Sequence, residues 1–388
     1  MGVRPAFDGE FLVHNRLTHS LKVGQLARRI AERLLQSPPV GVTLTLDPDV
    51  AEAAGLAHDL GHPPFGHIAE KELDRLVKEK VGADAEGYEG NAQSFRILVS
   101  LTVSDTAPEE VIQGEPGVNW TRVSLNGVLK YPWLYHGHPE KADKWGAYAT
   151  EREVFDWARA EFEAKKRSVE AEIMDWADDI TYAIHDLADF YCAGLIPLHL
   201  LIDDKRARER DVFFERTCDR VPKIKARRTE YEAAFRQALE LCPLDGPYVG
   251  SQRQSRDLWS FCSELIARYV RAISVVPGGP LRDRGCAIRI DDAATDQTTI
   301  LKELTWHYVI QRSDLTTLQH GQLRMIKKLF KMFFSKIEQK KWEYFPEGFG
   351  QLIQDNPHVT PARWTADYIS GLTERQVRRL YQRITGQN

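Results

Sequence analysis

Apolar positions recur with a helical period through most of the chain. Between Arg16 and Gln36 they stand at positions 17, 21, 24, 27, 30, 31 and 34, a spacing that predicts an amphipathic helix. Asp47 followed by Pro48 is typical of a helix start, and it predicts a helix through 51–58 that Gly61 and the Pro63-Pro64 pair end. Further helices are predicted over 66–80, 91–101, 151–193 (one helix or two end to end), 259–275, 299–337 and 368–384.

Irregular segments separate these helices. Residues 104–147 carry four prolines and three tryptophans (Trp120, Trp133 and Trp145), which predicts loops and short helices packed by aromatic rings. A loop is predicted from Pro277 to Asp296, with a short strand at 287–290. Strand and helix units do not alternate, so a parallel α/β sheet is excluded and an all-α fold is predicted.

Composition narrows the class of protein. The 388 residues include 52 basic and 56 acidic side chains, a net charge of −4, which is unlike a dedicated nucleic-acid binder. No run of 18 apolar residues is present, so no membrane span is expected, and the start lacks the apolar core of a signal peptide. The five cysteines are scattered and never form Cys-x-x-Cys. Reduced thiols in a cytoplasmic protein fit this pattern.

The segment 203–236 is rich in charge of both signs. A solvated helical face is the interpretation we favour. A phosphate-binding surface or a subunit contact is the alternative.

Histidines concentrate near the start of the chain, where five of the twelve lie between His14 and His67. A lone buried histidine is usually an ordinary core residue. Here His58 and Asp59 are adjacent, and burying both without partners would be costly. A divalent metal accepts imidazole and carboxylate together. His19, on the preceding predicted helix, is a third candidate ligand.

A fourth ligand has to come from elsewhere, and the Asp178-Asp179 pair is the best candidate. At about 100° per residue, Asp178, Tyr182 and Asp186 fall within about 80° of one another on one helix face. The opposite face carries the apolar residues Ile173, Ile180, Ile184, Leu187 and Tyr191. The helix therefore has a core side and a separate polar side.

Longer motifs carry a resemblance to a known family. They are His14–Ser20, His58–His67, Tyr88–Leu98, Leu125–Trp133 and Ala177–Tyr182, with weaker likeness at Leu304–Phe330 and Tyr368–Gly386. Together they resemble the deoxynucleoside triphosphate triphosphohydrolases, the bacterial dGTPase-like proteins among the HD-domain phosphohydrolases. The bare His-Asp pair is a weak signal, whereas the string from His58 to His67 is a strong one.

The resemblance implies an all-α HD-domain core at residues 1–200 and a helical region at 201–388 that packs on it. It implies roles for eleven residues: His19, His58, Asp59 and Asp178 as metal ligands, His67 and Glu70 in acid/base chemistry with His62 beside the phosphates, and Arg16, Asn91, Tyr182 and Asp186 in substrate binding. Asp178 is chosen over Asp179 because the family's sugar-contacting tyrosine and aspartate follow the ligand by four and eight residues.

The implied reaction is hydrolysis of dGTP or other dNTPs to a deoxynucleoside and inorganic triphosphate. Mixed nitrogen and oxygen ligation favours manganese, with iron, cobalt, nickel and magnesium as alternatives. The resemblance also implies a homo-oligomer, a nucleotide activator and weak binding of single-stranded nucleic acid as further partners, and no membrane.

Two rival functions remain open. Other HD proteins cleave cyclic nucleotides, alarmones or single-stranded nucleic acid ends, and their monophosphate products would distinguish them. A non-catalytic nucleotide-sensing module is the second rival, and the start of the chain only thirteen residues before His14 favours it.

Overall fold

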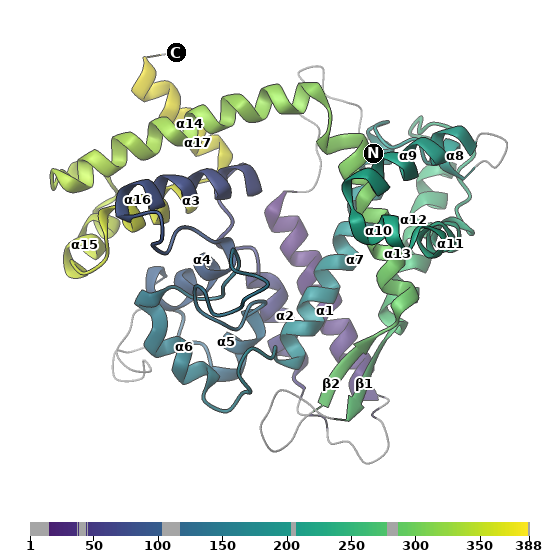
Figure 1. The fold of residues 1–388 in the computed structure, drawn as a ribbon, viewed down its shortest axis with the longest axis horizontal. Helices are drawn as coiled ribbons and strands as arrows, with labels where there is room; N and C mark the ends of the chain where they lie inside the picture. Colours follow the sequence, from purple (N-terminus) through teal and green to yellow (C-terminus); the bar gives the residue numbers. More distant parts are fainter. Residues whose placement is uncertain are drawn as a thin grey trace. The chain divides into compact units, whose positions relative to one another are not determined.

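A computed structural model describes residues 15–36, 38, 44, 46–102, 117–202, 207–277 and 286–386. Within these residues the fold is built from helices α1–α17 and one two-stranded sheet (Figure 1). The predicted all-α class is therefore confirmed. The chain divides into two compact units, each made of segments that are distant in sequence. The predicted division into 1–200 and 201–388 stays a prediction.

The first unit comprises Met1–Leu56, Glu172–Gly279 and Asp283–Thr316. Its elements are α1 (Arg16–Gln36), α2 (Pro48–Ala57), most of α7 (Val169–Cys192), α8 (Leu198–Leu201), α9 (Ala207–Arg220), α10 (Pro222–Ala226), α11 (Arg228–Leu239), α12 (Gln252–Arg271), β1 (Ile273–Pro277), β2 (Cys286–Ile290), α13 (Asp292–Thr305) and the π-helix η6 (Trp306–Ile310). α11 packs on α13, and β1 contacts α1 and α12.

The second unit comprises Ala57–Ala171, Pro280–Arg282 and Thr317–Asn388. Its elements are α3 (His67–Val81), α4 (Gly90–Arg96), the π-helix η1 (Ile97–Leu101), α5 (Arg122–Val128), η4 (Ala149–Glu151), α6 (Arg152–Arg159), most of α14 (Ser313–Glu338), η7 (Trp342–Tyr344), α15 (Glu347–Asp355), α16 (Pro361–Ser370) and α17 (Glu374–Thr385). α3 packs on α16, and α4 packs on α5.

α7 has the two faces that the sequence predicts. The five residues of the predicted apolar face are at most 1% exposed: Ile173, Ile180, Ile184, Leu187 and Tyr191. The indole of Trp176 donates to the carbonyl of Tyr269 at 3.1 Å. Of the two alternatives predicted for 151–193, the structure has two helices, and residues 160–168 separate α6 from α7.

Three predicted helices need correction. The helix over 259–275 ends at Arg271, and the residues from Ile273 pair with β2 instead. The helix over 299–337 is interrupted between η6 and α14. The helix over 368–384 is broken after Ser370, and Thr373 starts α17 with a capping box. The predicted strand at 287–290 is confirmed within β2, while residues 278–285 of the predicted loop lie outside the described residues.

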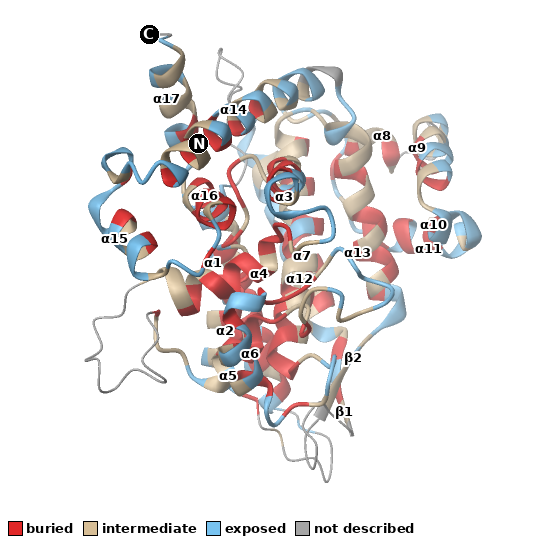
Figure 2. Ribbon diagram, turned by 60° about the vertical axis from the view of Figure 1, so that its left-hand side comes forward, coloured by how far each residue is buried: buried red, intermediate tan, exposed pale blue. Residues whose placement is uncertain are grey.

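α16 lies largely inside the second unit, with eight of its ten residues buried (Figure 2). Asp367 of α16 faces Arg96 of α4, whose Nη2 lies 2.9 Å from its Oδ2. Arg96 also pairs with Glu151, and all three side chains are at most 3% exposed. This buried charge network joins α4, η4 and α16.

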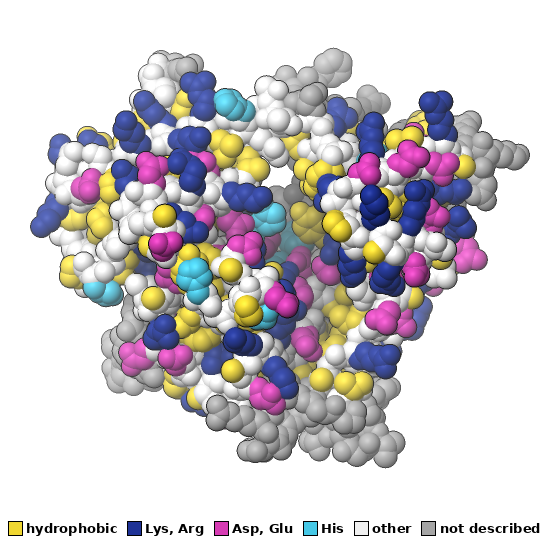
Figure 3. Space-filling view, in the orientation of Figure 1, with side chains coloured by type: hydrophobic (Ala, Val, Ile, Leu, Met, Phe, Trp, Pro, Cys, Tyr) yellow, Lys and Arg dark blue, Asp and Glu magenta, His cyan; other side chains and the backbone are white. Residues whose placement is uncertain are grey.

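Charged residues of both signs cover α9–α11 on the face drawn in Figure 3. Several of the basic side chains there have acidic partners, as in the pairs Arg227–Asp296 and Arg228–Glu232. The described part of the segment 203–236, from residue 207 onward, thus has a mixed-charge surface.

Candidate active site

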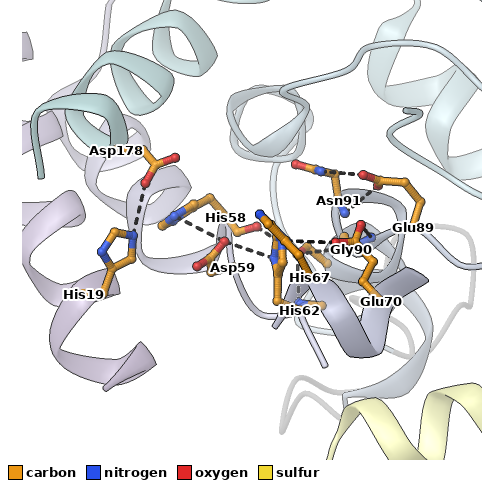
Figure 4. A network of polar contacts seen from close by, with 12 residues as sticks. His19, His58, Asp59, His62, His67, Glu70, Glu89, Gly90, Asn91 and Asp178 are labelled. Atoms are coloured by element: carbon orange, nitrogen blue, oxygen red, sulfur yellow. Dashed lines mark hydrogen bonds and ion pairs between the residues drawn. The ribbon is translucent and has the colours of Figure 1, made fainter. Parts of the chain in front are cut away.

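His19 and Asp178 face each other in the first unit. His19 lies in the first turn of α1, and Asp178 lies near the middle of α7. The Nε2 atom of His19 is 3.1 Å from Oδ1 of Asp178, and the side chains are only 12% and 17% exposed. Figure 4 shows them pointing toward each other. An imidazole and a carboxylate in this arrangement are a pair of donors suited to a divalent metal.

The neighbouring aspartate has a different partner. Asp179 accepts a hydrogen bond from the ammonium of Lys302 at 2.8 Å. One residue turns a helical side chain by about 100°, so the carboxylates of Asp178 and Asp179 point in different directions and have different partners. The geometry favours Asp178, the residue that the resemblance selects.

Tyr182 and Asp186 continue the Asp178 face of α7. Tyr182 is 43% exposed, and its ring stands edge-on to that of His19 with centroids 6.0 Å apart. Burial raises the pKa of Asp186 to about 7; His19 opposes this shift, while Asp189 and Asp178 add to it. The carboxyl group of Asp186 is largely buried, but it lies on the same helix face as the exposed Tyr182. This arrangement is suited to binding a hydroxyl group.

The raised pKa of Asp186 gives a stability prediction. The folded protein holds a proton that the unfolded chain releases above about pH 3.8, the ordinary pKa of this carboxyl group. The free energy of unfolding therefore decreases as pH rises from about 4 to 7. Asp186→Asn should stabilise the metal-free protein at pH 8 by on the order of 2 kcal/mol, after allowance for partial solvent exposure, and by less than half of that at pH 5.

Urea denaturation at the two pH values measures the effect. Asp211→Asn, an exposed change on α9, is the matched control and should change little. Equal stabilisation by Asp186→Asn at both pH values would contradict the assigned proton.

In the second unit, one tight turn after α2 brings together His58, Asp59 and His62. The Oδ1 atom of Asp59 lies 3.5 Å from Nε2 of His58 and 3.0 Å from Nδ1 of His62 (Figure 4). His58 is 5% exposed. Burial disfavours the charged form of His62, but the carboxylate of Asp59, together with those of Glu70 and Glu89, outweighs this and raises the pKa of the imidazole.

The backbone of this turn is held by the motif that begins at Tyr88. The hydroxyl of Ser94 donates to the carbonyl of His58 at 3.0 Å and accepts the N–H of Gly61 at 2.9 Å. The hydroxyl of Tyr88 donates to the carbonyl of Gly61. A Cβ atom on Gly61 would lie 2.2 Å from the backbone nitrogen of Ser94, so only glycine fits there.

His67 and Glu70 form a second histidine–carboxylate pair. His67 is the first residue of α3, and its side chain is 72% exposed; its Nδ1 atom lies 3.1 Å from Oε2 of Glu70, which is 8% exposed. Burial opposes the ionisation of Glu70, but the hydrogen bond with His67 and the charge of Lys144 lower its pKa strongly. A buried carboxylate therefore orients an imidazole that is exposed to solvent.

Donor atoms of His62, His67 and Glu70 all lie within 4.8 Å of one another. These three residues form a group whose donor atoms suit a divalent cation, as do the His–Asp pairs above.

Two residues at this site were missed by the sequence analysis as functional candidates. Lys144 places its ammonium 3.1 Å from Glu70 and 2.9 Å from Glu89. Glu89 immediately precedes α4 and caps it. An acidic residue just before a predicted helix could have indicated this cap. Lys144 lies in an irregular segment 74 residues after Glu70, and nothing local in the sequence indicates the contact.

The remaining predicted residues lie on these same elements. Arg16 is the exposed first residue of α1, one turn before His19. The side-chain amide of Asn91, in α4, donates to Glu89 at 2.8 Å. The first unit thus carries His19, Asp178, Tyr182, Asp186 and Arg16, and the second carries His58, Asp59, His62, His67, Glu70 and Asn91.

Two family models match the chain. The HD domain matches residues 16–110, which include His19, His58 and Asp59, and the phosphohydrolase-associated domain matches residues 288–383.

Curated relatives extend over nearly the whole chain. The deoxyguanosinetriphosphate triphosphohydrolase-like protein of Streptomyces coelicolor is 31% identical over 378 residues, covering 96% of this chain and 83% of that protein. The chain belongs to this triphosphohydrolase-like family. Members so named in Corynebacterium glutamicum strain R and Shewanella pealeana are 30% and 29% identical, covering 82% and 84% of those proteins.

Membership confirms the predicted resemblance and supports a phosphohydrolase built on an HD domain. None of the described helices combines the length and the apolar character needed to cross a membrane.

Proposed function

We propose that the protein hydrolyses deoxynucleoside triphosphates, dGTP or a broader set, to a deoxynucleoside and inorganic triphosphate. The observation that carries the proposal is the His67–Glu70 pair, in which a buried carboxylate orients an exposed imidazole at 3.1 Å. This pair lies in a member of the triphosphohydrolase-like family. An imidazole titrates near neutral pH and can transfer a proton to or from a reacting phosphate ester.

Metal dependence is part of this proposal. The donor pairs His19–Asp178 and His58–Asp59 each offer one imidazole and one carboxylate, and we assign these four residues as the ligands of one divalent ion. Such mixed donors favour manganese, iron, cobalt or nickel over magnesium. When bound, the ion would neutralise charge on phosphate oxygens and lower the pKa of a water molecule.

The chain's own groups supply the other steps. His67, oriented by Glu70, would exchange the proton between the attacking water and the 5′ oxygen that leaves the α-phosphate. His62 and Arg16 would bind phosphate oxygens as hydrogen-bond donors. The substrate-binding set would be completed by Asn91 on α4.

Selection of the sugar is assigned to α7. Tyr182 has an accessible ring beside His19, and it would pack on the deoxyribose where a 2′ hydroxyl needs room. Asp186, one turn further along α7, would accept a hydrogen bond from the 3′ hydroxyl. A cytoplasmic location, a homo-oligomer, a nucleotide activator and weak binding of single-stranded nucleic acid stay predictions.

Product analysis tests the function. Purified protein loaded with manganese is incubated with each dNTP and with GTP, and a deoxynucleoside with intact triphosphate is the expected product. Asp178→Ala should lose both metal and turnover, because it removes a ligand. Asp179→Ala is the matched control and should keep most of the metal, since its carboxylate pairs with Lys302.

Each alternative outcome has a meaning. Monophosphate products would assign the protein to the HD phosphodiesterases on other nucleotides or nucleic acid ends. Binding without turnover, with any metal and with nucleotide mixtures, would favour a sensing module. Loss of metal in Asp179→Ala but not in Asp178→Ala would move the ligand by one residue.

A further inference from the structure

A buried carboxylate at the start of α4 takes no part in the chemistry proposed above. Glu89 is 1% exposed. Its Oε2 atom accepts the backbone N–H groups of Asn91 at 2.6 Å and Ala92 at 2.9 Å, which caps the helix. Its Oε1 atom accepts the side-chain amide of Asn91 at 2.8 Å and the ammonium of Lys144 at 2.9 Å. One oxygen of Glu89 thus accepts hydrogen bonds from the backbone, and the other accepts them from two side chains.

Lys144 connects Glu89 to the acid/base pair. Its ammonium also donates to Oε1 of Glu70 at 3.1 Å, and that same oxygen accepts the N–H of Gly90 at 3.2 Å. The other oxygen of Glu70 faces His67. A continuous series of polar contacts therefore runs from Glu89 through Lys144 and Glu70 to His67, and most of these residues are drawn in Figure 4.

Helix capping alone does not explain Glu89. Serine, threonine or asparagine caps a helix without placing a charge in the core, whereas burying an ionised glutamate is costly unless it is paired. Lys144 is that partner, and it also keeps the carboxylates of Glu70 and Glu89 from repelling each other. The segment lies directly against the site, because a Cβ atom on Gly90 would be 3.1 Å from the ring of His62.

We propose that Glu89 is a positioning residue for the hydrolysis. Its buried carboxylate fixes the ammonium of Lys144 against Glu70, which sets the orientation of His67, and it fixes the side-chain amide of Asn91. This role rests on the proposed function of the His67–Glu70 pair, and it acts through other side chains without contact with substrate.

The variant Glu89→Gln separates the two functions of the carboxylate. The glutamine oxygen can keep accepting the backbone N–H groups, whereas its NH₂ group would oppose the donors of Asn91 and Lys144. We expect kcat to fall about 10- to 100-fold, the range typical of residues that orient an active-site group, with KM changed about threefold at most and metal content unchanged.

Lys144→Met should give the same loss of kcat, and Lys144→Arg should restore most of it. The double variant Glu89→Gln/Lys144→Met should be no slower than either single variant, because both break the same series of contacts. Glu86→Gln and Lys141→Met are matched controls from the neighbouring sequence and should keep normal kcat. Glu86 accepts the backbone N–H of Ala149, and Lys141 is exposed.

Normal kcat in Glu89→Gln, or losses that multiply in the double variant, would overturn the proposal. Glu89 would be merely structural if the loss of kcat in Glu89→Gln and Lys144→Met followed a lowered unfolding temperature and Lys144→Arg were as slow as Lys144→Met. Failure of the proposed function is a different result, in which wild type and His67→Ala release equal amounts of triphosphate. A crystal structure of Glu89→Gln decides the positioning in that case, because Lys144 remaining within hydrogen-bond distance of Glu70 would also overturn it.

Discussion

Replacing His67 with alanine should reduce kcat by about 10²- to 10⁴-fold while the bound metal is retained. The imidazole is 72% exposed and contacts Glu70 at its Nδ1 atom, so its loss removes the proton carrier without opening a cavity. His67 is not among the four proposed ligands. Steady-state release of triphosphate and metal analysis of the same sample measure the two quantities.

Two further variants make the result for His67 specific. Glu70→Gln should give a smaller loss, because the imidazole remains but is oriented by a neutral group. His320→Ala, an exposed change on α14, should leave kcat unchanged. Normal turnover in His67→Ala would assign the proton transfer to another group.

Arg96→Met should lower the free energy of unfolding of the second unit by about 3–5 kcal/mol. The change leaves the buried carboxylates of Asp367 and Glu151 without their cation, and removing one partner of a buried ion pair has a cost of this size. The pKa of Arg96 is raised because the attraction of the two carboxylates outweighs burial, and burial raises the pKa of Glu151. Urea denaturation followed by circular dichroism measures the loss.

Arg75→Met is the control for this experiment. Arg75 is 53% exposed and pairs with Glu72 and Glu79 along α3, so the expected change is about 1 kcal/mol or less. Making the network neutral, with Asp367→Asn and Glu151→Gln added to Arg96→Met, should recover part of the stability. A triple variant less stable than Arg96→Met would show that the lost cation is not the cause.

The sequence predicted regular helices well and their interruptions poorly. α1 has the predicted bounds, and α3 differs by one residue at each end, because a long apolar period is a strong signal. The residues from Ile273 onward were included in a helix, although a short run of β-branched residues suits a strand equally well. The break between α16 and α17 had readable signals in Gly371 and the Thr373–Gln376 capping box.

At the site, residues in local motifs were accessible to sequence reasoning, and residues joined only by the fold were not. The string from His58 to His67 is compact enough to suggest its chemistry, and helix geometry placed Asp178, Tyr182 and Asp186 on one face. Lys144 and Asp367 contact Glu70 and Arg96 from 74 and 271 positions away. No periodicity or spacing connects such pairs.

The buried position of α16 has a consequence for synthesis of the chain. Every residue proposed for the chemistry has been translated by position 186, but α3, which carries His67, packs on a helix that starts at Pro361. At a synthesis rate of roughly 5–20 residues per second, α16 is complete on the order of 15–60 s after α3. During that time the apolar face of α3 is available to chaperones and to other nascent chains. A premature stop codon before α16 would therefore leave all the proposed catalytic residues in a chain that cannot complete the core beneath them.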